Sequence, residues 1–184
     1  MIQNSFFEKR QRSVREIIDF NQLDGILFTN LENIRYFCGF TGSDGALLIA
    51  RKETSFLTDS RYWTQAEEEV KQSRIIHYKK KLDGIASLLS DIKLKKVGVE
   101  GSSFTLSSYQ FLMKKLGGEV EFISLEDEIK NLRAVKDPQE LSLIRAAIDL
   151  STRSFTHIME MLKEGSVERE VALEMEFFMK KNGA

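Results

Sequence analysis

The chain has 184 residues, enough for one domain of ordinary size or for one domain with part of another. It is 42% hydrophobic and 30% charged, a composition that excludes an intrinsically disordered chain. Its 27 basic and 28 acidic residues leave a net charge of −1, which excludes a general attraction to nucleic acid or to acidic membranes.

The N-terminal segment predicts a helix followed by strands. Residues 1–15 mix charged and apolar side chains and lack the apolar core of a signal peptide, and no apolar run reaches 18 residues. We therefore expect a cytoplasmic protein with no membrane association. A helix is predicted over Phe6–Phe20 from its apolar periodicity. The apolar runs Gly25–Thr29 and Ile34–Phe37 predict strands, separated by a break at Asn30–Asn33.

The next segment is rich in glycine. Gly39–Gly45 contains G-x-x-G-x-x-G, and we expect a tight turn between two strands rather than a phosphate-binding loop, because no helix follows it. Cys38, the single cysteine, excludes an intrachain disulfide, and its apolar neighbours predict a buried residue. The strands predicted at Ala46–Ala50 and Ser55–Thr58 are joined too tightly for a parallel crossover, so the sheet should be mixed.

Strands and helices alternate from there to residue 124. Asp59 or Ser60 is predicted to cap a helix that runs to about Val70. The later elements are expected as a strand at Arg74–Tyr78, a helix at Leu82–Ser90, a strand at Lys96–Glu100, a helix at Ser107–Leu116 and a strand at Glu119–Ile123. This alternation predicts an α/β fold, a mixed sheet with helices on both faces.

Beyond Ser124 the sequence becomes helical. A short helix is predicted at Asp127–Leu132. Asp137, Pro138 and Glu140 then form a helix start, with a capping side chain, a proline in the first turn and a glutamate three residues past the cap. That helix should end before Gly165, and Ser166 should cap a last helix that ends near Asn182. We divide the chain into a domain at 1–126, a linker at 127–137 and two further helices at 138–184.

Several segments together resemble the N-terminal domain of the aminopeptidase P, prolidase and creatinase family. The resemblance lies in their order and spacing: an aromatic-rich segment ending in Gly-Phe, an apolar strand, and Thr-Asp-Ser-Arg-Tyr before a helix. The segments are Tyr36–Gly45, Ala46–Ala50, Thr58–Ala66, Val97–Glu100, Leu132–Asp137 and Gly165–Glu168. The resemblance implies a creatinase-type N-terminal domain, followed by the first two helices of a truncated pita-bread catalytic domain.

The same resemblance implies a function for the parent protein. Its relatives are Xaa-Pro aminopeptidases and dipeptidases, metallopeptidases that act on peptides with proline at position two. Their two divalent metals, often manganese, are held by two Asp, one His and two Glu, and none of these five maps onto this chain. His77 and His157 do not make up a ligand set either, because neither has a second ligand-type residue at suitable spacing. We therefore expect an inactive, metal-free fragment that walls the active-site cleft and supports a homodimer.

The Thr-Asp-Ser-Arg-Tyr motif carries the candidate site. An arginine at a strand-to-helix junction can present a fork of donors to a carboxylate. By resemblance, Arg61 beside Asp59 reaches toward an active site, in some dimeric members that of the neighbouring subunit, and Phe40, Tyr62 and Trp63 offer an apolar wall to a proline ring. The alternative interpretation is that Asp59 caps the helix, Arg61 makes a surface or inter-domain ion pair and the aromatic residues belong to the core.

Two other functions stay open. Some relatives use this fold as a non-catalytic module that binds peptides or proteins, and others are creatinase-type C–N hydrolases. A separate expectation concerns the C-terminal helices: their apolar stripes should leave an exposed surface, so we expect self-association through Leu141–Phe178 or disorder of that segment.

Overall fold

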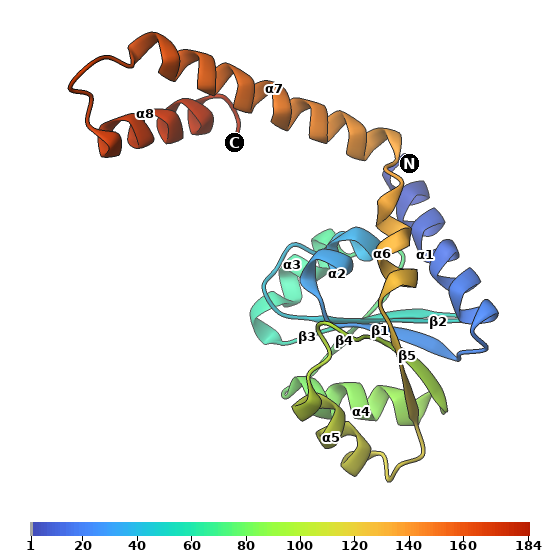
Figure 1. The fold of residues 1–184 in the computed structure, drawn as a ribbon. Helices are drawn as coiled ribbons and strands as arrows, with labels where there is room; N and C mark the ends of the chain where they lie inside the picture. The colour runs from blue at the N-terminus through green and yellow to red at the C-terminus, as the bar shows by residue number, and fades with distance from the viewer. Residues whose placement is uncertain (1) are drawn as a thin grey trace. The chain divides into compact units, whose positions relative to one another are not determined.

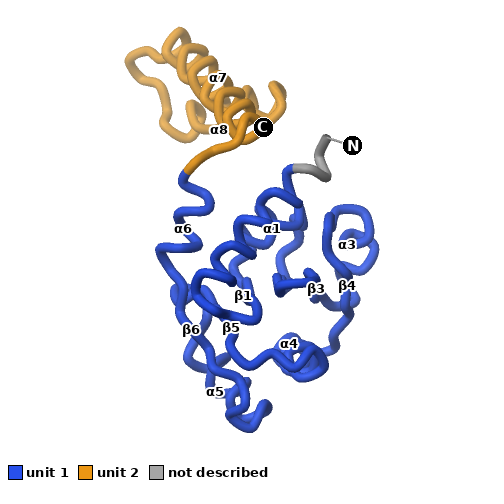
Figure 2. Tube along the Cα trace, turned by 90° about the vertical axis from the view of Figure 1, so that its right-hand side faces the viewer, with its two compact units in different colours: residues 1–134 blue, residues 135–184 orange. Residues whose placement is uncertain are grey.

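The computed structural model describes residues 2–184, with side chains described from Phe6 onward. The chain divides into two compact units, residues 1–134 and residues 135–184 (Figure 2). Among the helices of residues 2–184, none is both long and apolar enough to span a bilayer.

A six-stranded sheet forms the centre of the first unit, in the order β4-β3-β2-β1-β5-β6 (Figure 1). β2 is antiparallel to both β1 and β3, whereas the pairs β3–β4, β1–β5 and β5–β6 are parallel. The short turn at 51–53 forces the antiparallel pairing of β2 with β3, and the predicted mixed sheet is confirmed. The strands are β1 Gly25–Phe28, β2 Ala46–Ala50, β3 Thr54–Thr58, β4 Arg74–His77, β5 Lys96–Glu100 and β6 Glu121–Leu125.

Helices cover both faces of this sheet, as predicted (Figure 1). Successive β1 residues point to opposite faces: Ile26 and Phe28 pack in the core with α1, α2, α3 and α6, while Leu27 packs in the core with α4 and α5. Apolar side chains on both faces of the central strands require this double cover. The helices are α1 Ile2–Phe20, α2 Leu31–Cys38, the 3₁₀ turn η1 Ser60–Tyr62, α3 Trp63–Glu69, α4 Lys81–Asp91, α5 Leu106–Lys115 and α6 Asp127–Ala134.

The strand predicted at Ile34–Phe37 is wrong, because this segment forms helix α2. The side chain of Asn30 caps the helix by accepting a hydrogen bond from the Asn33 backbone N–H at 3.1 Å. Gly39 ends it in the left-handed conformation, with φ at 88° and its N–H donating to the Arg35 carbonyl. The two caps and the helical spacing of the buried residues outweigh the β-propensity of the aromatic and branched side chains.

The loop at 39–45 is consequently not a turn between two strands. It joins the end of α2 to the start of β2. The predicted strand before the loop is therefore wrong, whereas the predicted strand after it is present. Gly42 has no room for a side chain, because an added Cβ would lie 2.3 Å from the Phe40 ring and 2.9 Å from that of Tyr62. The loop is thus packed against the aromatic residues that follow α2 and β3.

The second unit is a pair of helices, α7 Pro138–Met161 and α8 Glu168–Lys181. The predicted start of α7 is confirmed: the Asp137 side chain accepts from the Glu140 N–H at 2.9 Å, and the Glu140 side chain accepts from the Asp137 N–H at 3.0 Å. The predicted cap at Ser166 is wrong, since α8 starts after Val167 and the Ser166 hydroxyl accepts from the Lys163 N–H instead. Between the helices, His157 Nε2 lies 2.8 Å from Glu174 Oε1.

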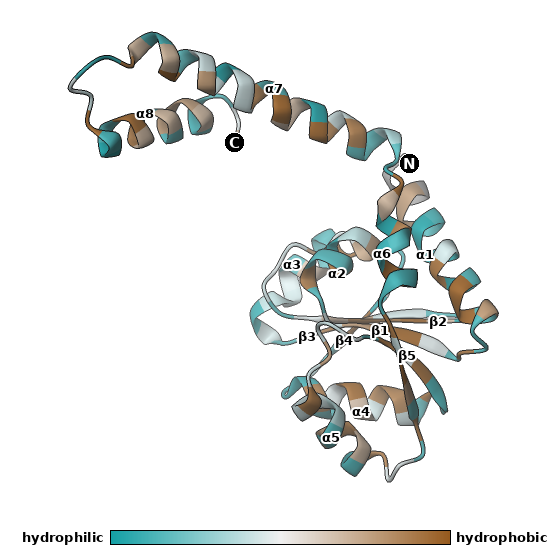
Figure 3. Cartoon of the chain, in the orientation of Figure 1, coloured by the Kyte–Doolittle hydropathy of each residue, from teal (hydrophilic) through white to brown (hydrophobic). Residues whose placement is uncertain are grey.

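Both helices of the second unit carry apolar residues along their length (Figure 3), and several of these have exposed side chains. Leu143 is 65% exposed, Ile148 and Phe155 are each 59% exposed, and Phe177 on α8 is 61% exposed. Two helices alone cannot enclose an apolar stripe on every side. Self-association through Leu141–Phe178 stays a prediction.

Candidate functional site

Asp59 and Arg61 lie where β3 ends. Asp59 caps η1 by accepting from the Arg61 backbone N–H at 2.9 Å, and its carboxylate also accepts from Arg61 Nε at 3.1 Å and Nη2 at 2.7 Å. The guanidinium thus binds Asp59 through its Nε and Nη2 groups. Its Nη1 group has no hydrogen-bond partner among the side chains described from residue 6 onward. The Arg61 side chain is 64% exposed. The structure therefore contains the cap and the ion pair of the alternative interpretation and leaves one donor of the fork free.

Each of these two charges stabilises the charged form of the other. The hydrogen bond from Arg61 is the largest cause that lowers the pKa of the Asp59 carboxyl below its usual range. The same hydrogen bond raises the pKa of Arg61. The pair is ionised at neutral pH, so Nη1 presents a charged donor that is held in one direction, although Asp59 offsets part of the charge.

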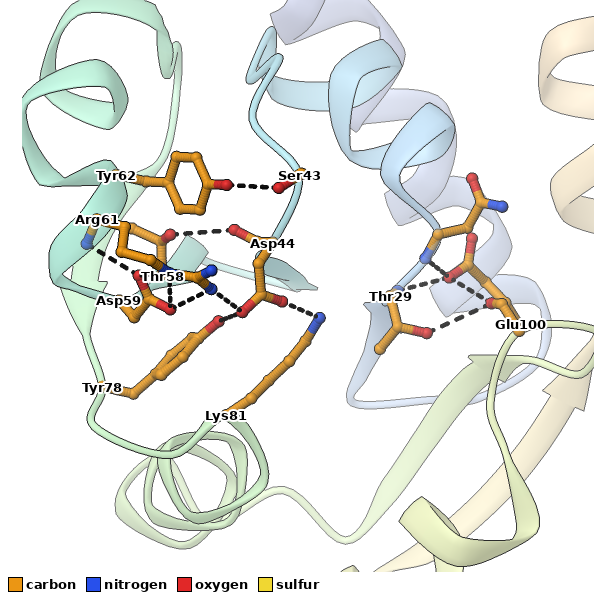
Figure 4. A network of polar contacts seen from close by, with 12 residues as sticks. Thr29, Ser43, Asp44, Thr58, Asp59, Arg61, Tyr62, Tyr78, Lys81 and Glu100 are labelled. Atoms are coloured by element: carbon orange, nitrogen blue, oxygen red, sulfur yellow. Dashed lines mark hydrogen bonds and ion pairs between the residues drawn. The ribbon is translucent and has the colours of Figure 1, made fainter.

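Asp44 approaches this pair from the neighbouring loop and links it to Tyr78 and Lys81 (Figure 4). Its carboxylate accepts from the Tyr78 hydroxyl at 2.9 Å, from Lys81 Nζ at 2.9 Å and more weakly from Arg61 Nη2 at 3.4 Å. Its backbone carbonyl accepts from Thr58 Oγ1 at 3.1 Å. Burial first, and then the hydrogen bond to Asp44, raises the pKa of Tyr78. Sequence reasoning missed Asp44, Tyr78 and Lys81, because no local pattern marks residues that meet only through the order of the strands.

The three predicted aromatic residues lie at different depths. Phe40 is buried, with 1% of its surface exposed, and packs edge-on against Tyr62 at 5.7 Å between ring centroids. The Tyr62 hydroxyl forms a hydrogen bond with Ser43, and the Arg61 guanidinium lies 5.3 Å from the Tyr62 ring centroid. Trp63 is 43% exposed and stacks on His77 at 4.1 Å. Tyr62 therefore lies beside Arg61 and is supported from the core by Phe40, while Trp63 contacts His77 of β4.

This arrangement suits recognition rather than bond cleavage. The free Nη1 of Arg61 can donate to a carboxylate or a carbonyl, and the Tyr62 ring beside it can contact an apolar group. Cys38 is not available as a nucleophile, since it is fully buried and burial raises its pKa to about 12. Within the described part of the chain, no three or more His, Cys, Asp or Glu side chains lie together as a metal site. The described residues therefore do not fit a catalytic metal.

A second polar cluster lies in the interior of the same unit, around Glu100 at the end of β5 (Figure 4). Glu100 is 3% exposed. Its Oε2 accepts from the backbone N–H groups of Thr29 at 2.6 Å and Asn30 at 2.8 Å, and its Oε1 accepts from Asn33 Nδ2 at 2.5 Å. Ser103 Oγ donates to Oε2 at 3.1 Å. The protein's own carboxylate thus occupies the start of α2, which leaves this cluster with a structural role.

Comparison with known proteins gives a consistent result. The creatinase/prolidase N-terminal domain family matches residues 10–135. The peptidase YqhT of Bacillus subtilis is 33% identical over 163 residues, which cover 88% of this chain and 46% of that protein. A solved Xaa-Pro dipeptidase from Bacillus anthracis superposes with a TM-score of 0.89 and 32% identity, covering 97% of this chain and 50% of that one.

One solved structure of an N-terminal domain alone also matches this chain. The N-terminal domain of the cytoplasmic peptidase PepQ from Mycobacterium tuberculosis has a TM-score of 0.64 and 27% identity, and the match covers 68% of this chain and 98% of that domain. By contrast, the chain spans about half the length of the curated relatives it matches.

Proposed function

This chain belongs to the creatinase/prolidase N-terminal domain family, and we propose that it is the non-catalytic N-terminal portion of a proline-specific metallopeptidase, a Xaa-Pro aminopeptidase or dipeptidase. The observation that carries the proposal is the likeness to the Xaa-Pro dipeptidase of Bacillus anthracis, which extends through both units of the chain. The parent protein would act on peptides with proline at position two.

In this proposal the end of β3 forms one wall of the active-site cleft. The free Nη1 of Arg61 donates to a carboxylate or carbonyl of the peptide, and Asp59 holds the guanidinium in position. Tyr62 and Trp63 lie beside the proline ring, and the buried Phe40 supports Tyr62. The wall supplies orientation and excludes water, and none of its residues performs the chemical step.

The catalytic parts lie outside this chain in the same proposal. Two divalent metals, manganese by resemblance, are held by residues of the catalytic domain other than those present here. A homodimer places the wall of one subunit near the cleft of the other. The cytoplasmic assignment is supported by the name of the PepQ relative and by the single buried cysteine.

The test uses the protein made from the intact coding sequence. We expect it to cleave Xaa-Pro peptides, and we expect Arg61→Ala to lower kcat/KM about 10- to 100-fold, because one charge-assisted contact to the substrate is lost. Arg61→Lys should recover only part of this loss, since an ammonium group cannot reproduce the planar fork. Steady-state kinetics on a panel of peptides with and without proline measures both effects.

Arg12→Ala is the matched control, because Arg12 is also an exposed arginine in an ion pair, 3.8 Å from Glu8. It should leave kcat/KM unchanged. If Arg61→Ala behaves like Arg12→Ala, the wall is not formed by Arg61. If the intact protein cleaves no Xaa-Pro peptide yet binds peptides, the proposed function is replaced by the binding module.

A further inference from the structure

Strand β4 ends the sheet on one side and leaves backbone groups open. It pairs only with β3, in parallel, and the Tyr78 N–H donates to the Thr58 carbonyl at 3.0 Å. Because backbone groups alternate along a strand, the N–H and C=O of Ile75 and His77 point away from β3. Within the described residues, no hydrogen bond reaches these four groups.

We propose that β4 pairs antiparallel with β4 of a second copy of this chain about a two-fold axis through Ile76, joining the two sheets into one. In this register Ile75 lies opposite the partner's His77, and His77 lies opposite the partner's Ile75. The two pairs form four backbone hydrogen bonds and use every open group of both strands. A register centred on Ile75 or on His77 would leave some of these groups unpaired.

The side chains suit this register. Ile76 meets the partner's Ile76 at the axis, an apolar contact on the face that carries α4. Arg74 lies opposite the partner's Tyr78, which places a cation beside an aromatic ring. On the opposite face, His77 carries the stacked Trp63 and lies next to the partner's Ile75. No pair in the register sets two like charges directly opposite each other.

A groove beside β4 gives the second argument, from charge. It has a volume of about 550 Å³, lies between β4 and α4, and is lined by Arg74, Lys79 and Lys80 together with Asp91 near the end of α4. Neither Asp91 nor the two lysines form an ion pair within the described residues. Antiparallel pairing brings the Lys79–Lys80 end of one copy to the Arg74–Asp91 end of the other. Each Asp91 thereby gains cationic neighbours from the partner and offsets the repulsion that the same lysines meet at Arg74.

This inference rests on the homodimer of the proposed function and specifies which surface forms it. It does not depend on peptidase activity. If the chain dimerises through β4 but the protein cleaves no Xaa-Pro peptide, the inference stands and the proposed function is wrong. If the protein is an active monomer, the proposed function stands and the inference is wrong.

Disulfide trapping in the 184-residue chain tests the register directly. Residues that face each other in a non-hydrogen-bonded antiparallel pair have Cα atoms about 4.5 Å apart, within the span of a disulfide. Ile76→Cys should therefore form a cross-linked dimer under a mild oxidant, seen on a non-reducing gel. Ile75→Cys is the matched control and should remain uncross-linked, because it faces the other side of the sheet and lies opposite His77. Cys38 is fully buried, so the unmodified chain gives the background.

A second pair of variants tests the hydrogen bonds. His77→Pro removes an N–H that β3 does not use, so the strand should remain intact while the dimer dissociation constant rises about 10- to 100-fold. His77→Ala keeps the N–H and should retain the dimer. Sedimentation velocity measures the association, and circular dichroism verifies the fold.

Ile148→Lys distinguishes association through the exposed helices of the second unit from association through β4. This substitution should not affect the Ile76→Cys cross-link. The inference is overturned if Ile76→Cys fails to cross-link. It is equally overturned if His77→Pro leaves the association unchanged while Ile148→Lys abolishes it.

Discussion

The clusters around Glu100 and Asp44 lie along the same side of the sheet, where strands β3 and β5 end and β2 begins (Figure 4). They nevertheless use their carboxylates differently. Glu100 is 3% exposed, and both of its oxygens accept from groups of the interior. The Asp44 side chain is 28% exposed and lies 3.4 Å from Nη2 of Arg61, whose side chain is 64% exposed. The first cluster is closed within the protein, whereas the second leaves the Nη1 group of Arg61 free.

The difference shows what distinguishes a structural polar cluster from one that can bind. A buried carboxylate must satisfy its acceptors internally, because an unpaired buried charge is costly. An exposed arginine can keep part of its fork for a ligand, since water satisfies the unused donor until a ligand arrives. Both clusters contain acidic side chains near helix starts, so composition alone does not separate them. Burial and the count of internal partners do.

The largest effect is expected from breaking the closed cluster. Glu100→Ala should lower the free energy of unfolding of the first unit by about 3–5 kcal/mol, because it leaves the N–H groups of Thr29 and Asn30 and the Asn33 amide without their acceptor. Urea unfolding followed by the fluorescence of Trp63, the single tryptophan, measures the change in this unit. Glu119→Ala is the control: that side chain is 74% exposed, and the loss should stay below about 0.5 kcal/mol. A similar cost at both positions would show that the Glu100 cluster is not what holds this edge together.

A smaller effect is expected in the open cluster. Asp44→Asn should cost about 1 kcal/mol and should lower the pKa of Tyr78, which burial and the hydrogen bond to Asp44 hold above its ordinary value of 10.0. Because the folded pKa is raised, the stabilisation is fully present below that ordinary value and is lost as the pH rises through the folded one. Alkaline absorbance titration measures the phenolate, and Tyr78→Phe identifies its signal. An unchanged Tyr78 titration in Asp44→Asn would contradict the role given to Asp44.

The smallest effect concerns the exposed pair. The hydrogen bond from Arg61 lowers the pKa of Asp59, so Arg61→Ala should return that pKa toward 3.8. Because the folded pKa is depressed, the contribution of Asp59 to stability is present above pH 3.8 and is lost as the pH falls through the folded value. Carboxyl NMR titration measures the shift, and Arg61→Lys should give an intermediate value. If Asp59 titrates alike in all three proteins, the ion pair does not form in solution.

Local signals were enough for much of the fold. Gly25–Phe28 and Ala46–Ala50 are uniformly apolar, and the structure buries both as central strands. The start of α7 needs only Asp137, Pro138 and Glu140, because capping acts within one turn. The segment 34–37 was mispredicted because its side chains favour a strand, whereas its caps at Asn30 and Gly39 favour a helix.

The candidate site required the tertiary structure. Thr58, Asp59 and Arg61 are neighbours in sequence, and the resemblance singled out Asp59 and Arg61 in their motif. Asp44 meets Tyr78 across 34 residues and Lys81 across 37, and these contacts exist only because β3 lies between β2 and β4.

The sequence by itself therefore determined most of the elements, the mixed sheet and the family, since caps, periodicity and a short turn act over a few residues. Only the tertiary structure decided which charged side chains form contacts, which nitrogen of Arg61 remains free and which strand lies at the edge of the sheet. Those outcomes depend on the order of the strands, and strand order is set by packing between segments far apart in the chain.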